Sequence, residues 1–166
     1  VITVVEGQVA YTFPSDKRFK INVQENVPGL DFITKLKPVT YNFDTQKFTK
    51  FLVQDMPDSL QAVYLKDNFE PSTNIVHTGF LAQEVEQICK ELGYDFDGLH
   101  KPESANDNYS VGYSQFVMPL VKAVQELNDE NKALKAKVSE MDKIKADNEA
   151  IKAELQTLKN MILQGK

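Results

Sequence analysis

The sequence is poor in the residues that build metal sites and disulfides. It has one cysteine, two histidines and no tryptophan. A single cysteine, Cys89, excludes an internal disulfide framework and any cysteine-rich zinc site. His77 and His100 show no metal-ligand spacing, so we expect neither a metal nor any other cofactor.

A long hydrophobic run and a basic stripe are also missing. No apolar segment approaches the ~20 residues that cross a bilayer. No basic segment carries interleaved aromatic residues, and the formal net charge is -5. We therefore expect neither a membrane nor a nucleic acid as a partner.

The length and composition of the chain fit one modest domain with an appended segment. The chain has 166 residues, of which 42% are hydrophobic. It begins at Val1 without a signal-peptide pattern, so we interpret it as a fragment of a longer protein. Its pattern changes twice, which predicts three zones: residues 1–14, 15–112 and 113–166.

Residues 1–14 are rich in β-branched and aromatic side chains. Val9, Tyr11 and Phe13 alternate with small or polar residues, which is the periodicity of a strand. A two-stranded piece alone is marginally stable in water. We expect this zone to be the end of an upstream β-rich passenger or stalk, or to pair between subunits.

Residues 15–112 alternate short helical and strand patterns, which predicts an α+β head. The helix expected over 80–92 is the clearest, because an apolar face recurs along it and Gly93 is a fitting C-terminal stop. That face consists of Leu81, Val85, Ile88 and Leu92. The other expected elements are a helix at 30–36, a strand at 39–43, helices at 45–54 and 58–66, a strand at 75–77 and a turn-rich stretch at 98–108.

Three single features in this zone have ordinary structural readings. Cys89 lies close to the apolar face of its helix, which predicts a small core residue. His77 is a lone histidine and is interpreted as structural. The acidic run Tyr94–Gly98 lacks the spacing of a calcium loop, which predicts a solvated turn.

Residues 113–166 are dominated by a heptad pattern. Apolar or Asn residues recur at alternating steps of four and three, and the other positions are mostly charged. The step from Met141 to Ile144 is a second consecutive step of three residues. Such an irregularity is a stammer, which locally overwinds a supercoil. The predicted seam consists of Leu127, Asn131, Leu134, Val138, Met141, Ile144, Asn148, Ile151, Leu155, Leu158 and Ile162.

This seam predicts a coiled coil between chains. A seam Asn fixes register at some cost in stability, as a trimerisation device requires. A single amphipathic helix packed on its own domain is the alternative, which six heptads with charged flanks disfavour. Pro119 is awkward inside a helix and suggests a kink or a helix start near the head.

The segment Ser15–Asn22 reads SDKRFKIN and resembles the S-D-x-R-x-K-x-N signature of one family. This is the intramolecular chaperone domain at the C-terminus of phage endosialidases and other tail spikes and fibres. The resemblance covers about residues 15–130. Further segments match in the same order: Lys37–Asn42 (KPVTYN), Thr78–Val85 (TGFLAQEV), Tyr109–Tyr113 (YSVGY) and Leu120–Leu127 (LVKAVQEL).

The resemblance implies a mechanism and a fold. The domain would trimerise the protein upstream of it and then cut itself off at the Pro14–Ser15 bond. Ser15 would be the nucleophile and Lys20 its general base. The motif residues in support would be Asp16, Arg18, Asn22, Gln83 and Glu84. The fold would be an α+β head followed by a long C-terminal helix that forms a parallel trimeric coiled coil.

The chemistry sets its own requirements. A serine hydroxyl is a poor nucleophile until a base takes its proton, and a lysine is a base only in its neutral form. The cation of Arg18 could favour that form, provided that Asp16 faces Arg18 or a backbone amide instead of Lys20. A turn must join Ser15 to Lys20, within one subunit or between two. A backbone amide is the expected oxyanion donor.

These inferences predict an intramolecular chaperone that drives homotrimerisation of an upstream fibre-like passenger and acts once as a serine endopeptidase. We expect it on a virion tail fibre or a bacterial cell surface, with assembly in the cytoplasm if it is phage-derived. The alternative is a structural trimerisation module that never cleaves. A third hypothesis, a fragment of a regulatory protein released from a membrane, lacks a DNA-binding or membrane segment.

Overall fold

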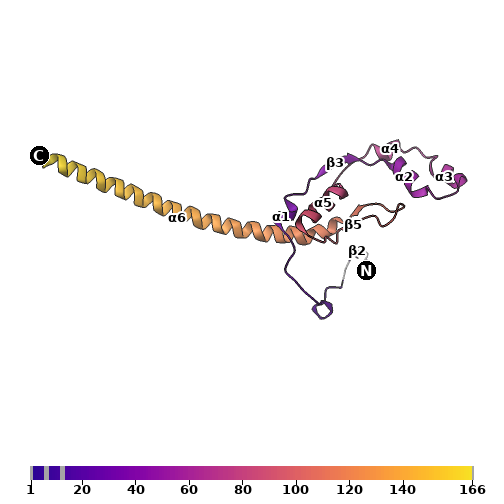
Figure 1. The fold of residues 1–166 in the computed structure, drawn as a ribbon, viewed down its shortest axis with the longest axis horizontal. Helices are drawn as coiled ribbons and strands as arrows, with labels where there is room; N and C mark the ends of the chain where they lie inside the picture. The colour runs from indigo at the N-terminus through magenta and orange to yellow at the C-terminus, as the bar shows by residue number, and fades with distance from the viewer. Residues whose placement is uncertain (1, 6–7, 12–13, 166) are drawn as a thin grey trace.

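The computed structural model describes residues 2–5, 8–11 and 14–165. A small head lies at one end of a single long helix, a helical lobe extends from the head, and the N-terminal segment hangs away from both (Figure 1). Helices and short strands are mixed in the head, so the predicted α+β class with a long C-terminal helix is confirmed.

The N-terminal strands pair with each other. β1 (Ile2–Val5) and β2 (Gln8–Tyr11) form an antiparallel hairpin with Val4 opposite Val9. The predicted continuation of the strand pattern to Phe13 lies outside the described residues.

The core of the head is a cluster of aromatic rings around one helix. α5 (Ala82–Leu92) contributes Val85, Ile88 and Cys89, all of them buried. The aromatic members are Phe32, Phe96 and Phe116, with ring centroids 5.1 Å apart for Phe32–Phe96 and 4.7 Å for Phe96–Phe116. Cys89 is a core residue as predicted, and burial raises the pKa of its thiol.

α5 begins later than predicted and ends where predicted. Leu81 is the residue before the helix and remains 47% exposed, so its assignment to the buried face was wrong. Gly93 ends the helix with a φ of 60°, a left-handed conformation that glycine adopts without a steric penalty. The amide of Gly93 donates to the Lys90 carbonyl, so the helix closes as the sequence indicates.

The run Tyr94–Gly98 differs from the predicted solvated turn. Phe96 is only 4% exposed and packs between Phe32 and Phe116, whereas Asp95 and Asp97 on either side of it are exposed. Alternation of charged and aromatic residues puts one face of this run into the core. The acidic residues of the run led to the prediction of a solvated turn.

α1 (Leu30–Ile33) fastens the start of the head to the long helix. It is shorter than the predicted 30–36 and packs directly on α6 (Val117–Gln164). A Cβ on Gly29 would lie 2.7 Å from the Ala123 amide nitrogen, so only glycine allows this close approach. The amide of Leu30 donates to Glu126 Oε2 at 2.7 Å, which caps α1 from the long helix.

A two-stranded ribbon carries the helical lobe. β3 (Val39–Asn42) and β4 (Val76–Gly79) pair antiparallel, with Tyr41 opposite His77. The lobe between them holds α2 (Thr45–Val53), α3 (Asp58–Tyr64) and α4 (Glu70–Thr73). α2 and α3 lie near their predicted positions, whereas α4 was not anticipated.

A second ribbon starts inside the stretch predicted as turns, residues 98–108, and ends after it. β5 (Leu99–His100) pairs with β6 (Ser110–Val111). A hydrogen bond of 2.8 Å between His100 Nε2 and Asp107 Oδ2 closes the loop between the two strands. From this loop the Asn106 side chain donates to the Asp55 carboxylate in the lobe. The loop therefore braces the lobe against the head.

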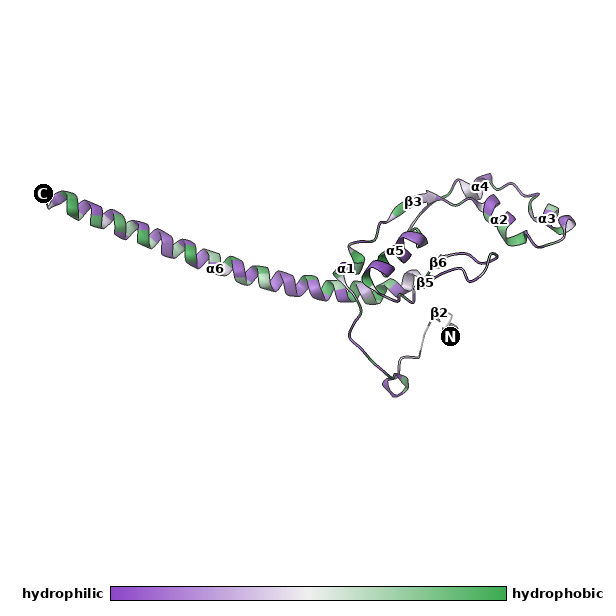
Figure 2. Ribbon diagram, viewed as in Figure 1, coloured by the Kyte–Doolittle hydropathy of each residue, from purple (hydrophilic) through white to green (hydrophobic). Residues whose placement is uncertain are grey.

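The long helix leaves the head after a 3-10 turn, η2 (Tyr113–Phe116). Pro119 is the third residue of α6, where its missing N–H has no helical partner to lose, so the prediction of a helix start here is confirmed. The helix has 48 residues and extends about 72 Å. Hydrophobic and hydrophilic residues alternate along its whole length (Figure 2).

Candidate functional site

The N-terminal arm, residues 14–26, carries the motif that resembles a peptidase signature. All of its residues are exposed, and it loops away from the head in Figure 1. The 3-10 turn η1 (Lys17–Phe19) lies within it. This turn reverses the chain between the two residues of the predicted dyad.

Ser15 and Lys20 are in contact. Their side chains meet with Lys20 Nζ 2.8 Å from Ser15 Oγ, within hydrogen-bond distance. Two backbone bonds hold the turn between them: Phe19 N–H to the Asp16 carbonyl at 3.1 Å and Lys20 N–H to the Lys17 carbonyl at 3.2 Å. An extended segment would keep residues five apart from touching, so the contact depends on η1.

Asp16 and Arg18 complete the turn. The Asp16 carboxylate accepts the Arg18 backbone N–H at 2.9 Å and the guanidinium at 2.6 Å. These bonds hold the pKa of the Asp16 carboxyl below its usual value and raise the pKa of Arg18. Asp16 thus faces Arg18 and a backbone amide, as the chemistry required, and Lys20 bonds the serine.

Asn22 ends the turn with an unusual backbone. Its φ of 53° lies in the left-handed region, which asparagine tolerates better than most side chains. The residue therefore changes the chain direction just after the dyad. This gives a physical reason for an asparagine at that position of the motif.

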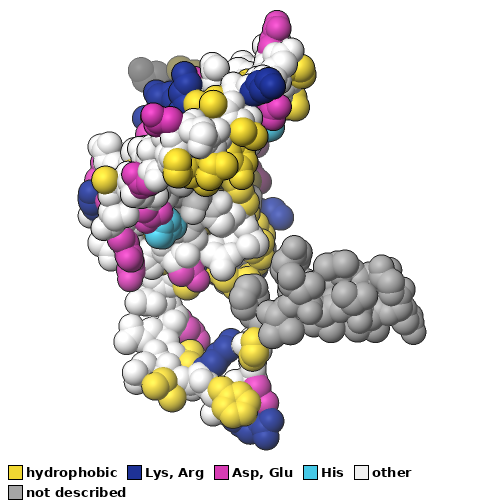
Figure 3. Space-filling model, turned by 90° about the vertical axis from the view of Figure 1, so that its right-hand side faces the viewer, with side chains coloured by type: hydrophobic (Ala, Val, Ile, Leu, Met, Phe, Trp, Pro, Cys, Tyr) yellow, Lys and Arg dark blue, Asp and Glu magenta, His cyan; other side chains and the backbone are white. Residues whose placement is uncertain are grey.

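The arm exposes apolar side chains together with the dyad. Phe19, Ile21 and Val23 are each more than 70% exposed. In Figure 3 the arm lies at the bottom of the view, with hydrophobic and charged side chains open to solvent. Exposed apolar patches occur at surfaces that bind proteins, membranes or ligands.

Gln83 and Glu84 lie away from the Ser15–Lys20 pair. Both belong to α5 on the head, whereas the dyad lies on the arm. Gln83 is exposed and lines a surface groove, and Glu84 is half-buried. The chain in this state does not bring these two motif residues to the dyad.

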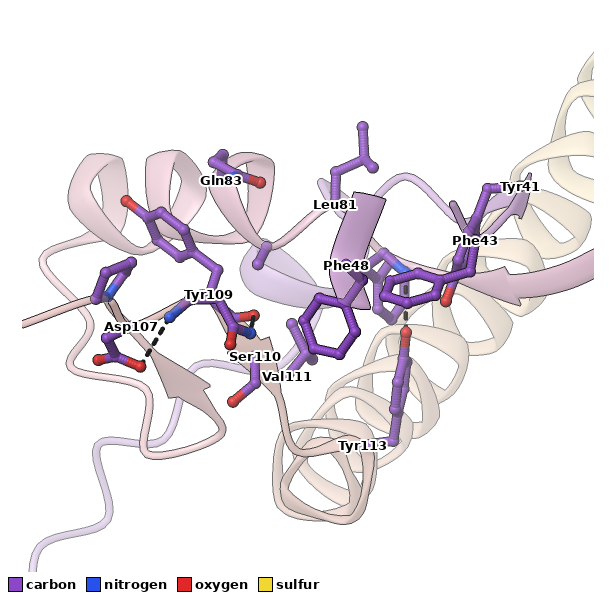
Figure 4. A pocket seen from close by; sticks show the side chains of 14 residues that line it. Tyr41, Phe43, Phe48, Leu81, Gln83, Asp107, Tyr109, Ser110, Val111 and Tyr113 are labelled. Atoms are coloured by element: carbon purple, nitrogen blue, oxygen red, sulfur yellow. Dashed lines mark hydrogen bonds between the residues drawn. The ribbon is translucent and has the colours of Figure 1, made fainter. Parts of the chain in front are cut away.

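The groove that Gln83 lines was not anticipated from sequence. It has a volume of about 650 Å³ and is bordered by aromatic rings of the two ribbons and α2 (Figure 4). Tyr113 Oη accepts the Phe80 N–H at 3.1 Å on one wall. A Cβ on Gly79 would collide with the Tyr113 hydroxyl, so glycine is needed there. The main aromatic borders are Tyr41, Phe43, Phe48, Tyr109 and Tyr113.

The heptad seam forms one uncovered stripe along α6. Its apolar members are between 46% and 69% exposed. The two seam asparagines bond back to their own helix, Asn131 Nδ2 to the Leu127 carbonyl at 3.0 Å and Asn148 Nδ2 to the Ile144 carbonyl at 2.9 Å. The helix is continuous through the stammer at Met141.

Residues 15–94 match the model of a peptidase family described as the chaperone of endosialidase. Over these residues the chain is similar to that family. The resemblance drawn from the motifs is confirmed over these residues, and the match begins at Ser15. No curated protein matches the chain.

The family supports an intramolecular chaperone role, and its name suggests a self-cleaving peptidase. Such a role implies association with a passenger domain upstream. Across the described part of the chain, every helix is too short or too polar to cross a membrane. Within residues 2–5, 8–11 and 14–165, no three His, Cys, Asp or Glu side chains gather as a metal site would require.

Proposed function

We propose that the chain trimerises an upstream fibre-like passenger and then releases it by cutting the Pro14–Ser15 bond through the Ser15–Lys20 dyad. The 2.8 Å contact between Lys20 Nζ and Ser15 Oγ, at the start of the segment that matches the family, carries this proposal. The site of action would be a virion tail fibre or a bacterial cell surface, with assembly in the cytoplasm for a phage protein.

Trimerisation is supported by the uncovered seam. A helix of about 72 Å cannot fold back on a head this small, so its apolar stripe needs other copies. Parallel helices bring three heads to one end. They would also bring three arms and three passengers together, as a chaperone of fibre assembly requires.

The proposed cleavage proceeds through an ester intermediate. Neutral Lys20 takes the proton of Ser15 Oγ, and this oxygen attacks the carbonyl carbon of Pro14. The Pro14–Ser15 carbon–nitrogen bond breaks, and the nitrogen receives the proton from Lys20. An ester between Pro14 and the Ser15 oxygen remains. Water hydrolyses that ester, leaving a carboxylate on Pro14 and a free amine on Ser15.

Exposure explains how cleavage would wait for assembly. Water stabilises the charged form of an amine, and both residues of the dyad are exposed in a single chain. A neighbouring subunit that covered the apolar side chains of the arm would exclude this water. The turn would then become catalytic only inside the assembled trimer.

A gel of freshly expressed protein tests the proposal. Cleavage predicts a band that lacks the fourteen residues before Ser15, whereas the intact chain has a mass of 18.8 kDa. Ser15→Ala should leave only the intact band. An intact band in the parent chain under all assembly conditions would contradict cleavage.

The second candidate function is a structural module that trimerises a fibre or adhesin and stays attached. The continuous heptad helix favours it independently of the dyad. A trimer that never cleaves would identify this function.

A further inference from the structure

An apolar hollow lies at the junction of the head with the long helix. Its volume is about 300 Å³, and it opens to the surface. Its walls are formed by α1 and the residues after it, by Phe80, by η2 and by Leu120 at the start of α6. The main lining residues are Ile33, Leu36, Phe80, Tyr113, Phe116 and Leu120.

The heptad register places this hollow relative to the seam of α6. With Asn131 at a and Leu127 at d, the same count puts Leu120 at d, Phe116 at g and Val121 at e. Leu120 therefore belongs both to the seam and to the wall of the hollow. The hollow opens beside the seam, on its g side.

Ala123 occupies the next g position along α6. Ala123 is buried, because α1 lies against it through the close contact at Gly29. Ile33 of the same helix forms the wall of the hollow opposite the long helix. The g side of the seam is thus a raised, apolar rim with a depression at its start.

The e side of α6 carries an exposed apolar side chain near the level of the hollow. In a parallel coiled coil, e and g positions flank the seam on opposite sides, so a g residue meets the e residue five positions later on its neighbour. The partner position of Phe116 is therefore Val121. Val121 is 48% exposed, although it lies outside the a and d positions.

We propose that the hollow is a socket for a second copy of this chain, filled by Val121 of that copy. This inference rests on the proposed trimer and adds an interface between the head of one chain and the helix of the next. A volume of about 300 Å³ accepts more than one aliphatic side chain, so the flank enters with Val121 at its centre. The contact locks the heads around the helix bundle in one rotational setting.

Met118 is the matched control. It is apolar, 61% exposed and three residues before Val121 on the same helix, but it falls at b, on the outside of the bundle. Val121→Asp should raise the concentration of half-dissociation by at least about tenfold, measured by light scattering. Met118→Asp should leave it near that of the parent chain.

Cross-linking locates the contact directly. Chains with Leu36→Cys are unfolded, mixed with Val121→Cys chains, refolded and oxidised. A product of doubled mass on a non-reducing gel is expected for this mixture. The mixture of Leu36→Cys with Met118→Cys should give none.

The outcomes separate this inference from the proposed function. If the parent chain is a monomer, both fail. If it is a trimer, but the Val121 and Met118 variants behave alike in dissociation and in cross-linking, the socket is wrong and the seam stands. If a Val121→Asp chain fails to fold, as judged by its helical circular dichroism, the cross-linking pair alone decides.

Discussion

The proposed dyad pairs the hydroxyl of Ser15 with the amine of Lys20, and the turn between them holds the two groups in contact. The contact already exists in a single exposed chain. What that chain lacks is a dry environment for the amine. Local sequence therefore sets the contact between the proposed nucleophile and base, and their activity is proposed to depend on assembly.

Removing either member of the dyad should stop the reaction. Lys20→Ala should lower the cleavage rate by about 10²–10⁴-fold, as the loss of a general base does. Ser15→Ala removes the nucleophile and should leave no cut product. The double variant should be no worse than Ser15→Ala, because the two groups act as one unit. Band densities over time on a gel measure the rates.

Lys20→Arg is the matched test of the base. A guanidinium keeps a positive charge and reach similar to that of lysine, but it does not give up its proton near neutral pH. Cleavage should be lost while the trimer persists. Cleavage by Lys20→Arg at the parental rate would show that the charge matters and proton transfer does not.

Asp107 should make the head sensitive to acid. It accepts the Glu103 N–H and the His100 ring, and these bonds hold the pKa of its carboxyl below the usual value. Its stabilising contribution is therefore present above about pH 4, the range of an unfolded aspartate, and is lost as pH falls through the lower folded value. Thermal unfolding between pH 6 and pH 2 checks this.

Asp107→Asn serves as the comparison. The gap in melting temperature between it and the parent chain should narrow as the pH falls. A gap that stays constant over the whole range would mean that the charge of Asp107 contributes nothing to stability.

At the scale of elements, the long helix is the part with the least support from its own chain. Leu134→Asp and Leu155→Asp should each dissociate the assembly, because every buried, unpaired charge costs several kcal/mol. Ala136→Asp and Ala153→Asp are the controls. They add the same charge at f positions, Ala136 two residues after Leu134 and Ala153 two residues before Leu155. Light scattering that gave equal masses for seam and control variants would contradict the coiled coil.

Predictability differed from element to element for physical reasons. The long helix, α5 and its stop at Gly93 follow from periodicity and from a backbone requirement, which are local. Phe96 was missed because its burial depends on Phe32 and Phe116, each more than fifteen residues away. The groove and the hollow are likewise made by segments distant in sequence.

The candidate site was predictable for the same local reason. Ser15 and Lys20 lie five residues apart, and the motif specifies the turn that joins them. The aspartate of that motif caps the turn and Asn22 redirects the chain. Gln83 and Glu84 belong to the motif set as well, but where α5 lies relative to the arm depends on contacts between segments distant in sequence. A single sequence carries no such information.

At the scale of the whole molecule, the N-terminal hairpin should be dispensable for assembly. The seam and the head lie C-terminal to it, so a chain that starts at Ser15 should remain a trimer. Sedimentation at micromolar concentration measures this. Collapse of the shortened chain to a monomer would show that residues 1–14 are part of the trimer interface.

Mixing of variants asks whether one subunit completes the site of another. Ser15→Ala chains are refolded together with Lys20→Ala chains, so that mixed trimers form. Cut product would place the lysine of one subunit beside the serine of its neighbour. Its absence is the outcome expected from the contact within one chain.

The central claim is that assembly switches on cleavage, and a comparison of cleavage in trimer and monomer tests it most directly. The parent chain and the Leu134→Asp, Leu155→Asp double variant are expressed and purified alike, and intact mass is followed over time beside the oligomeric state. The account predicts that the trimeric parent loses residues 1–14 and that the monomeric variant keeps them, with the Ser15→Ala trimer also uncut. Equal cleavage in parent and monomer, or none in the parent trimer, would contradict it.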